Sequence, residues 1–182
     1  DVPSGSPNEP GSSVVTYKES GANVNNPATY YATDVAPDII TKFSADPGWG
    51  HYELTGVMRF LHDRTSVTGS GQSHTSVAGG GGGGLILPII NKKLYFQASG
   101  LVGVGIGRYG TSNIPDYSFN QNGSTHPLPE ANVLLGVYGN PTKALRLYAY
   151  AGAEEVRSRA YFNAGGKSYG YGNPLYKMSG CN

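Results

Sequence analysis

The sequence predicts an all-β protein, an antiparallel up-and-down meander of long strands, on three observations. Apolar and polar residues alternate with a period of two over much of residues 38–159, which is the pattern of strands with one apolar face. Short and long connections alternate between these segments. Of the 182 residues 14% are charged and 28 are glycine, whereas an ordinary soluble domain has about 25% charged residues. No segment shows the 3.6-residue period of an amphipathic helix.

Six segments carry the alternation clearly, and two weaker ones flank them. In the most regular segment, Leu94–Tyr109, a helical period does not fit the apolar positions. The expected strands are Ile39–Asp46, His51–Arg64, Leu85–Ile90, Leu94–Tyr109, Asn132–Tyr138 and Leu145–Arg159, and the two weaker candidates are Ser13–Glu19 and Lys167–Met178.

The connections between these strands alternate in length. Short turns are expected at Asp46–Gly48, at Asn91–Lys93 and around Asn140-Pro141, and long polar loops over Thr65–Ala78, over Gly110–Glu130 and after Arg159. This alternation is typical of transmembrane β-barrels, which have tight turns at one end and longer loops at the other. Soluble β-sandwiches and lipocalin-like barrels also have alternating strands, but the loop lengths favour a membrane barrel or part of one.

The chain divides into two regions. Residues 1–36 form a lead rich in Pro, Ser, Gly and Asn, which is expected to be flexible. Residues 37–182 form the antiparallel β-barrel or partial barrel, with a C-terminal tail rich in Gly, Tyr and Asn. The tyrosines near strand ends suggest the aromatic girdle of a membrane barrel; they are Tyr52, Tyr95, Tyr109, Tyr138, Tyr148 and Tyr150.

One face of the second strand carries charge and is the candidate functional site. His51, Glu53, Arg59 and Asp63 share this face by parity. If the face borders a lumen, these side chains line a pore and bias the passage of ions. Arg146 and Glu154 join them if their strand also faces inward. The alternative is a solvated face whose opposite charges neutralise one another.

The motifs that suggest catalysis or cofactor binding fail on their context. Gly105–Gly110 satisfies G-x-G-x-x-G, but the residues after it do not predict a helix, which the dinucleotide site needs. The glycines of Gly79–Gly84 lack the Lys-Ser/Thr of a phosphate loop; they suggest a flexible loop end or a strand in a crowded place. The four histidines do not have the spacing of a metal site. We therefore expect no catalytic, cofactor-binding or metal site.

Several stretches resemble the uncharacterised porin-like outer-membrane proteins of environmental bacteria. The resemblance covers about residues 30 to 180 and is carried by Ala36–Ile40, Asp46–Glu53, Leu87-Pro88, Lys92–Leu94, Gly105–Gly110 and Tyr171–Tyr176. It implies an outer-membrane barrel and little more. Such barrels commonly finish on a strand with a terminal aromatic residue, and the smallest have eight strands. The resemblance therefore favours a piece of a longer chain.

The expected function is that of a non-enzymatic, porin-like wall or channel for passive passage of small solutes. Its partners would be the lipid bilayer of the bacterial outer membrane and, if the chain self-assembles, further copies in a homo-oligomer. The low charge density argues against nucleic acid. The alternative is a secreted extracellular β-rich protein, either a surface-fibre subunit or a glycan-binding module. The single cysteine, Cys181, suggests a disulfide partner elsewhere, or else a free thiol.

Overall fold

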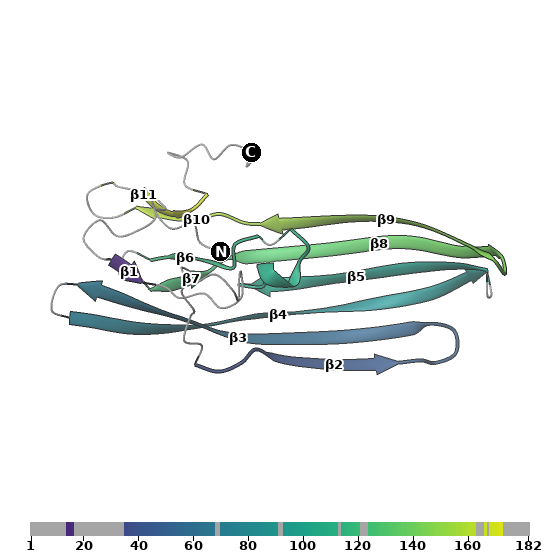
Figure 1. The fold of residues 1–182 in the computed structure, drawn as a ribbon, viewed down its shortest axis with the longest axis horizontal. Helices are drawn as coiled ribbons and strands as arrows, with labels where there is room; N and C mark the ends of the chain where they lie inside the picture. Colours follow the sequence, from purple (N-terminus) through teal and green to yellow (C-terminus); the bar gives the residue numbers. More distant parts are fainter. Residues whose placement is uncertain are drawn as a thin grey trace.

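The computed structural model shows one large antiparallel sheet with two small hairpins at one end (Figure 1). It describes residues 14–16, 35–67, 70–90, 93–112, 114–120, 124–162, 166 and 168–172. The strands in this part of the chain are β1 (Val14–Thr16), β2 (Ile39–Ala45), β3 (His51–Val67), β4 (Ser70–Ile90), β5 (Leu94–Val104), β6 (Tyr117–Phe119), β7 (Thr125–Pro127), β8 (Pro129–Thr142), β9 (Leu145–Val156), β10 (Arg159–Phe162) and β11 (Ser168–Tyr171), with a 3₁₀ turn, η1 (Gly107–Tyr109), after β5.

The large sheet is a six-strand meander in the order β2-β3-β4-β5-β8-β9, with β1 also paired to β3. Every pairing is antiparallel. The predicted fold class, an all-β antiparallel meander of long strands, is confirmed. In the described residues β2 and β9 each pair on one side, so the sheet is open there.

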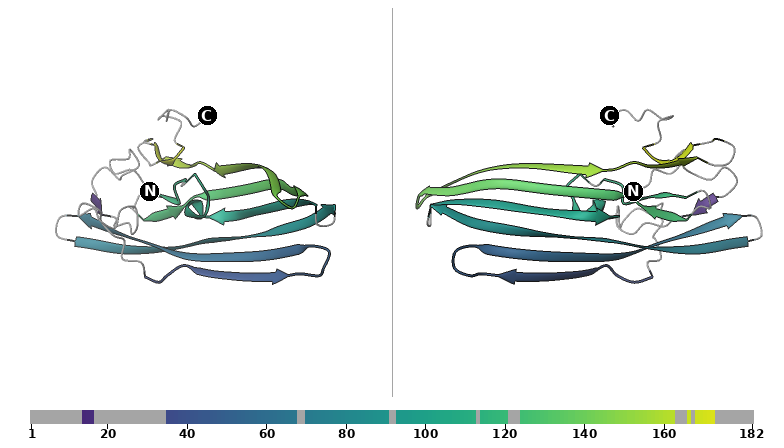
Figure 2. Two further views of the ribbon diagram at one scale, coloured as in Figure 1. Left: turned by 45° about the vertical axis from the view of Figure 1, so that its right-hand side comes forward. Right: turned by 180° about the vertical axis from the view of Figure 1, so that it is seen from behind.

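The β2–β3, β4–β5 and β8–β9 turns lie together at one end of the sheet, and the long connection from β5 to β8 lies at the other, together with the β3–β4 turn (Figure 1). The prediction that Thr65–Ala78 is a loop was wrong, because β3 and β4 continue through it as a paired hairpin from Met58↔Gly79 to Val67↔Ser70. This hairpin projects past the neighbouring strands in both views of Figure 2. The glycine run lies inside β4 for the same reason.

Other boundaries also differ from the sequence expectation. The strand expected to reach Tyr109 ends at Val104, because Gly105 has a φ of 64° and turns the chain. The β6–β7 hairpin occupies part of the loop expected over Gly110–Glu130, and β8 begins within it at Pro129. Of the two weaker strands, the structure shows β1 and β11, and Gly172 after β11 is in a turn; the rest of both candidates and nearly all of residues 1–36 lie outside the described residues.

The two faces of the sheet differ in chemistry. We call the face that carries Arg59, Glu130 and Glu154 the inner face and the opposite face the outer face. Cross-strand register places apolar side chains on the outer face of every long strand. Exposed members of this set are Ile39, Phe43, Leu54, Met58, Val77, Val102, Val133, Leu135, Val137 and Leu147. The apolar outer face is therefore exposed, whereas a soluble sheet buries its apolar face.

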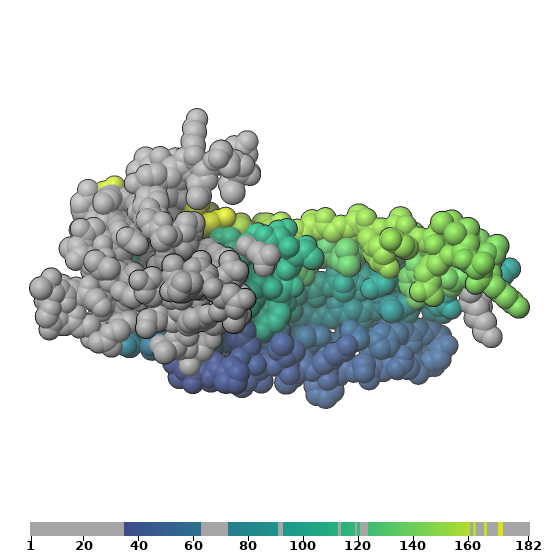
Figure 3. Space-filling view, viewed as in Figure 1, coloured from purple at the N-terminus to yellow at the C-terminus, as the bar shows by residue number. Residues whose placement is uncertain are grey.

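Burial is concentrated at the loop end of the inner face. The buried apolar residues in the described chain are Val57, Leu61, Ala78, Ile106 and Leu128, and as many polar or charged residues are buried with them. The segment after β5 and the β6–β7 hairpin supply part of this core. The described part of the molecule is elongated along the strands (Figure 3). Its one helical element is η1, so the described residues contain no helix that could cross a bilayer.

Candidate functional site: the inner face and the strap across it

The six residues predicted from the sequence all occupy inner-face positions. Four of them lie on β3, where alternation places them on one face. The register from β9 across to β3 places the other two on that same face. They are His51, Glu53, Arg59, Asp63, Arg146 and Glu154. The side chain of Asp63 lies outside the described set, and its backbone pairs with that of His74.

These residues do not form one ring, because they lie at different heights along the strands. Arg146 is at the short-turn end, where its Nε donates to Asn140 Oδ1 at 3.0 Å. His51 and Glu53 lie nearer the middle of the sheet. Arg59 lies at the loop end, where the strand carries it under the segment that follows β5. A solute moving along this face would meet the charges in succession.

The middle group is a local network in which the charges offset one another. His51 Nδ1 lies 2.6 Å from Asp46 Oδ1, and its Nε2 lies 2.9 Å from Glu53 Oε1. Lys42 on β2 forms an ion pair with the same Glu53 oxygen. The two carboxylates therefore face one lysine and one imidazole. This part of the face has the balanced charge that the alternative interpretation described.

Arg59 is enclosed rather than open to solvent, since its side chain is 2% exposed. Its Nε lies 3.0 Å from Asp38 Oδ2, its Nη1 lies 2.9 Å from Asp116 Oδ2, and Nη1 also donates to the carbonyl of Gly105. Two carboxylates and a carbonyl satisfy the guanidinium, as burial of a charge requires. Arg59 therefore joins three segments of the chain, which differs from the open wall position expected of it.

The segment that follows β5 folds onto the inner face, and we call Gly105–Ser112 the strap. Gly105 is buried in a left-handed conformation, and a Cβ there would lie 2.8 Å from Ala78 Cβ, so glycine is needed at this turn. The amide of Ile106, also buried, donates to Glu130 Oε2. The amide of Arg108 donates to Asp116 Oδ1 at 2.9 Å. Protein carboxylates thus accept from this glycine-containing turn, where a dinucleotide site would offer its amides to phosphate.

Tyr109 is the aromatic residue of the strap. Its hydroxyl donates to Asp38 Oδ2 at 2.7 Å, and the Arg59 guanidinium carbon lies 5.6 Å from the ring centre. Partial burial, followed by the hydrogen bond to Asp38, raises the pKa of Tyr109 to about 12. The phenol therefore stays protonated and keeps donating through the physiological range.

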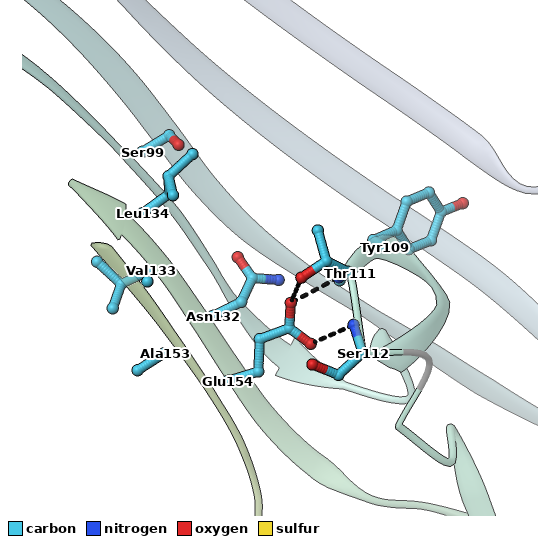
Figure 4. A pocket seen from close by; sticks show the side chains of 11 residues that line it. Ser99, Tyr109, Thr111, Ser112, Asn132, Val133, Leu134, Ala153 and Glu154 are labelled. Atoms are coloured by element: carbon cyan, nitrogen blue, oxygen red, sulfur yellow. Dashed lines mark hydrogen bonds between the residues drawn. The ribbon is translucent and has the colours of Figure 1, made fainter. Parts of the chain in front are cut away.

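Glu154 on β9 binds the far end of the strap (Figure 4). Its Oε1 accepts from the amide and the hydroxyl of Thr111, both at 2.5 Å, and its Oε2 accepts from the amide of Ser112 at 2.9 Å. Both carboxylate oxygens are used, and bonds to an ionised acceptor are stronger than neutral ones. The strap therefore crosses the inner face from the β3 side to the β9 side.

Two pockets lie beside the strap. One, of about 430 Å³, is bordered by Thr111, Ser112 and Glu154. The other, of about 270 Å³, is bordered by Ile40 and Glu53. Residues common to both pockets are Ser99, Tyr109 and Asn132. Tyr109 thus borders both spaces, and polar groups from β5 and β8 provide their shared floor.

The tyrosines expected in an outward girdle do not form one. Register places Tyr95, Tyr138, Tyr148 and Tyr150 on the inner face. The rings of Tyr95 and Tyr138 stack with centres 4.9 Å apart. Because adjacent residues of a strand point to opposite faces, proximity to a strand end says nothing about the face. Tyr52 is on the outer face, with Trp49 edge-on at 4.9 Å between ring centres.

Sequence reasoning missed the residues that hold the strap. Glu130 could have been found by parity, since it shares its face with Asn132 and Leu134 once the strand is extended back to Pro129. Asp38 and Asp116 lie outside regular strands, where no periodicity marks them. Within the described residues no group of three or more His, Cys, Asp or Glu side chains could hold a metal ion. Comparisons of the chain with protein-family models, with curated proteins and with solved structures give no match.

Proposed function

We propose that this protein is a non-enzymatic, porin-like wall or channel of the bacterial outer membrane that lets small solutes pass. The observation that carries the proposal is the reversed polarity of the sheet. Charged side chains gather on the inner face, while the exposed outer face is apolar on every long strand. Membrane barrels have this arrangement, because lipid covers the outer face and water or polar groups occupy the inside.

The apolar residues of the outer face form a band, and the boundary of this band at the loop end slants across the sheet. On β9 the last apolar outer residue before a charge is Ala153, which shares a row with Leu54 of β3. On β3, however, the apolar outer positions continue to Phe60, six residues beyond Leu54 (60 − 54). Six residues at about 3.3 Å, set against four strand spacings of about 4.8 Å, give a slope of roughly 45°. Membrane barrel strands tilt by about 35–45°.

The height of the apolar band, calculated with the same tilt, matches that of a membrane barrel. The outer positions of β5 are apolar along its full 11 residues. This length is about 36 Å along the strand, or roughly 25 Å along the membrane normal after a 45° tilt. The outward apolar band of such barrels is about 25 Å tall. Slant and height both follow from residue identities and register.

The test is whether the purified chain enters a membrane and conducts. It should partition into the detergent-rich phase, migrate as a compact form on gels until heated, and give stepwise currents in a planar bilayer. Recovery in the aqueous phase, with no conductance, would refute the proposal.

A secreted surface-fibre subunit is the second candidate, favoured by the two edges of the open sheet. β2 and β9 each lack a neighbour on one side in the described residues, and their side chains are mostly exposed. Unpaired edge strands can join copies edge to edge. Filaments that sediment without detergent or lipid would support this candidate over the channel.

A further inference from the structure

The two ends of the strap are held in different ways. At the β3 end, Gly105, Ile106 and Gly107 are buried, and Arg59 lies beneath them bound to Asp116. Loosening this end would leave buried charges without partners, which is costly. It behaves as a fixed point.

At the β9 end, one carboxylate holds the strap among the residues that the structure describes. Thr111 and Ser112 are exposed, and Glu154 is half-buried. Three hydrogen bonds join them, and Glu154 is the acceptor in each. Groups released here can be solvated by water, so opening this end costs far less than opening the other. Figure 4 shows Glu154 reaching up from β9 to the strap, with Asn132 beside it.

We propose that Glu154 is a positioning residue that latches the strap, and that release of this latch swings the Thr111–Ser112 end away from β9 about the Arg59 anchor. Because Thr111 and Ser112 border the pocket of about 430 Å³, their movement widens that space, while Tyr109 stays bound to Asp38 beside the anchor. Glu154 then determines how wide a path the inner face offers. The consequence for solute passage rests on the proposed function, whereas the latch itself does not.

The latch is tested by the accessibility of a thiol at Ser99, which lies on the floor of the pockets beside the strap and which we call the strap thiol. The parent for the test is Cys181→Ser with Ser99→Cys, which carries a single thiol, and the chain is held in detergent or lipid. Glu154→Gln removes the charge that strengthens the three bonds, and we expect maleimide to label the thiol roughly tenfold faster. The matched control is Glu155→Gln, because Glu155 is the next residue, exposed, and bound to Arg157 outside the strap. This variant should label at the parent rate.

A second thiol separates latch release from general loosening. With Thr41→Cys on β2 in place of the strap thiol, Glu154→Gln should leave the labelling rate unchanged. Equal labelling of the strap thiol in parent and Glu154→Gln would overturn the latch, and so would a parallel rise at Thr41→Cys. If the strap thiol responds but neither protein conducts in a bilayer, the latch stands and the proposed channel fails. If both conduct, Glu154→Gln should pass the larger current, and an unchanged current would overturn the link between strap and path.

Discussion

Two adjacent leucines on β8 give the sharpest test of which face meets lipid. Leu134 is 40% exposed and points to the inner face, and Leu135 is 46% exposed and points to the outer face. They pair with Ser99 and Ala98, which lie near the middle of β5. Both are thus exposed leucines at the centre of the sheet, and they differ in the face they occupy.

Arginine at these two positions should have unequal effects. Arginine on the lipid face of a membrane barrel costs about 2–4 kcal/mol at the bilayer midplane, so Leu135→Arg should lower the folding equilibrium constant roughly 30-fold to several hundred-fold. In Leu134→Arg the new side chain points into the pocket that Glu154 also lines, where a guanidinium can stay hydrated. Its cost should be below about 1 kcal/mol, as for an ordinary exposed substitution.

The assay is reversible urea unfolding in lipid vesicles, followed by the fraction of compact, unheated protein on gels. Wild type and both variants are compared at the same lipid concentration. Equal stabilities of Leu134→Arg and Leu135→Arg would refute the assignment of lipid to the outer face. A larger loss for Leu134→Arg would reverse the two faces.

Three further predictions concern the frame around the site. Arg59→Ala removes the buried cation that pairs with Asp38 and Asp116, leaves Asp116 only the longer contact with Arg108, and should cost about 3 kcal/mol or more in urea unfolding. Arg108→Ala, at a half-exposed guanidinium, should cost less than about 1 kcal/mol. Gly82→Ala drives a Cβ into a neighbouring carbonyl and should cost about 1–3 kcal/mol in stability. A Cβ at Gly81 would lie 3.8 Å from the nearest carbonyl oxygen, so Gly81→Ala should be neutral within about 1 kcal/mol. Equal losses for the two variants would contradict the register. The pKa of His126 lies below its ordinary 6.5, mainly because of burial and secondly because of a nearby arginine, so the folded state favours the neutral ring. The β6–β7 hairpin should therefore lose stability as pH falls below about 6.5. An NMR titration midpoint at or above 6.5 for His126 would contradict this.

The faces of the strands were predictable because their signal is local. Alternation along His51–Arg64 and Leu94–Val104 assigns each side chain to a face without knowledge of the neighbouring strand. The same parity placed Arg146 and Glu154 as a pair on β9. The pairs β2–β3, β4–β5 and β8–β9 followed from the expected short turns, since a two- or three-residue connection joins antiparallel neighbours.

The first half of β4 could not be predicted from its own residues. Ser, Thr and Gly have little to bury, and glycine weakens a strand in isolation. These residues form a strand because β3 runs beside them in register from Met58 to Val67. Close packing also explains the glycines, since a Cβ at Gly82 would collide with the Gly100 carbonyl. Tertiary pairing therefore overrides local propensity here.

The strap was invisible to sequence reasoning because its contacts join residues far apart in the chain. Tyr109 reaches Asp38 across 71 positions, and Thr111 reaches Glu154 across 43. Parity indicated that Arg59 and Glu154 face inward but not what covers them. Thus Arg59, expected to be an open wall charge, is the buried anchor of the strap.

The open edges and the apolar band each need a partner, and the two together favour the proposed membrane barrel over the fibre. Both β2 and β9 carry backbone groups that need partners, in lipid and in a fibre alike. An even number of strands, six in this meander, makes these two edges run in opposite directions, so each can accept an antiparallel neighbour. Edge pairing therefore satisfies these backbone groups under either proposal and does not discriminate between the two. A fibre joined through its edges would still leave Leu54, Val102 and Leu135 in water on the outer face. In the proposed barrel, a bilayer would cover that face over the height and slant of its uncharged band.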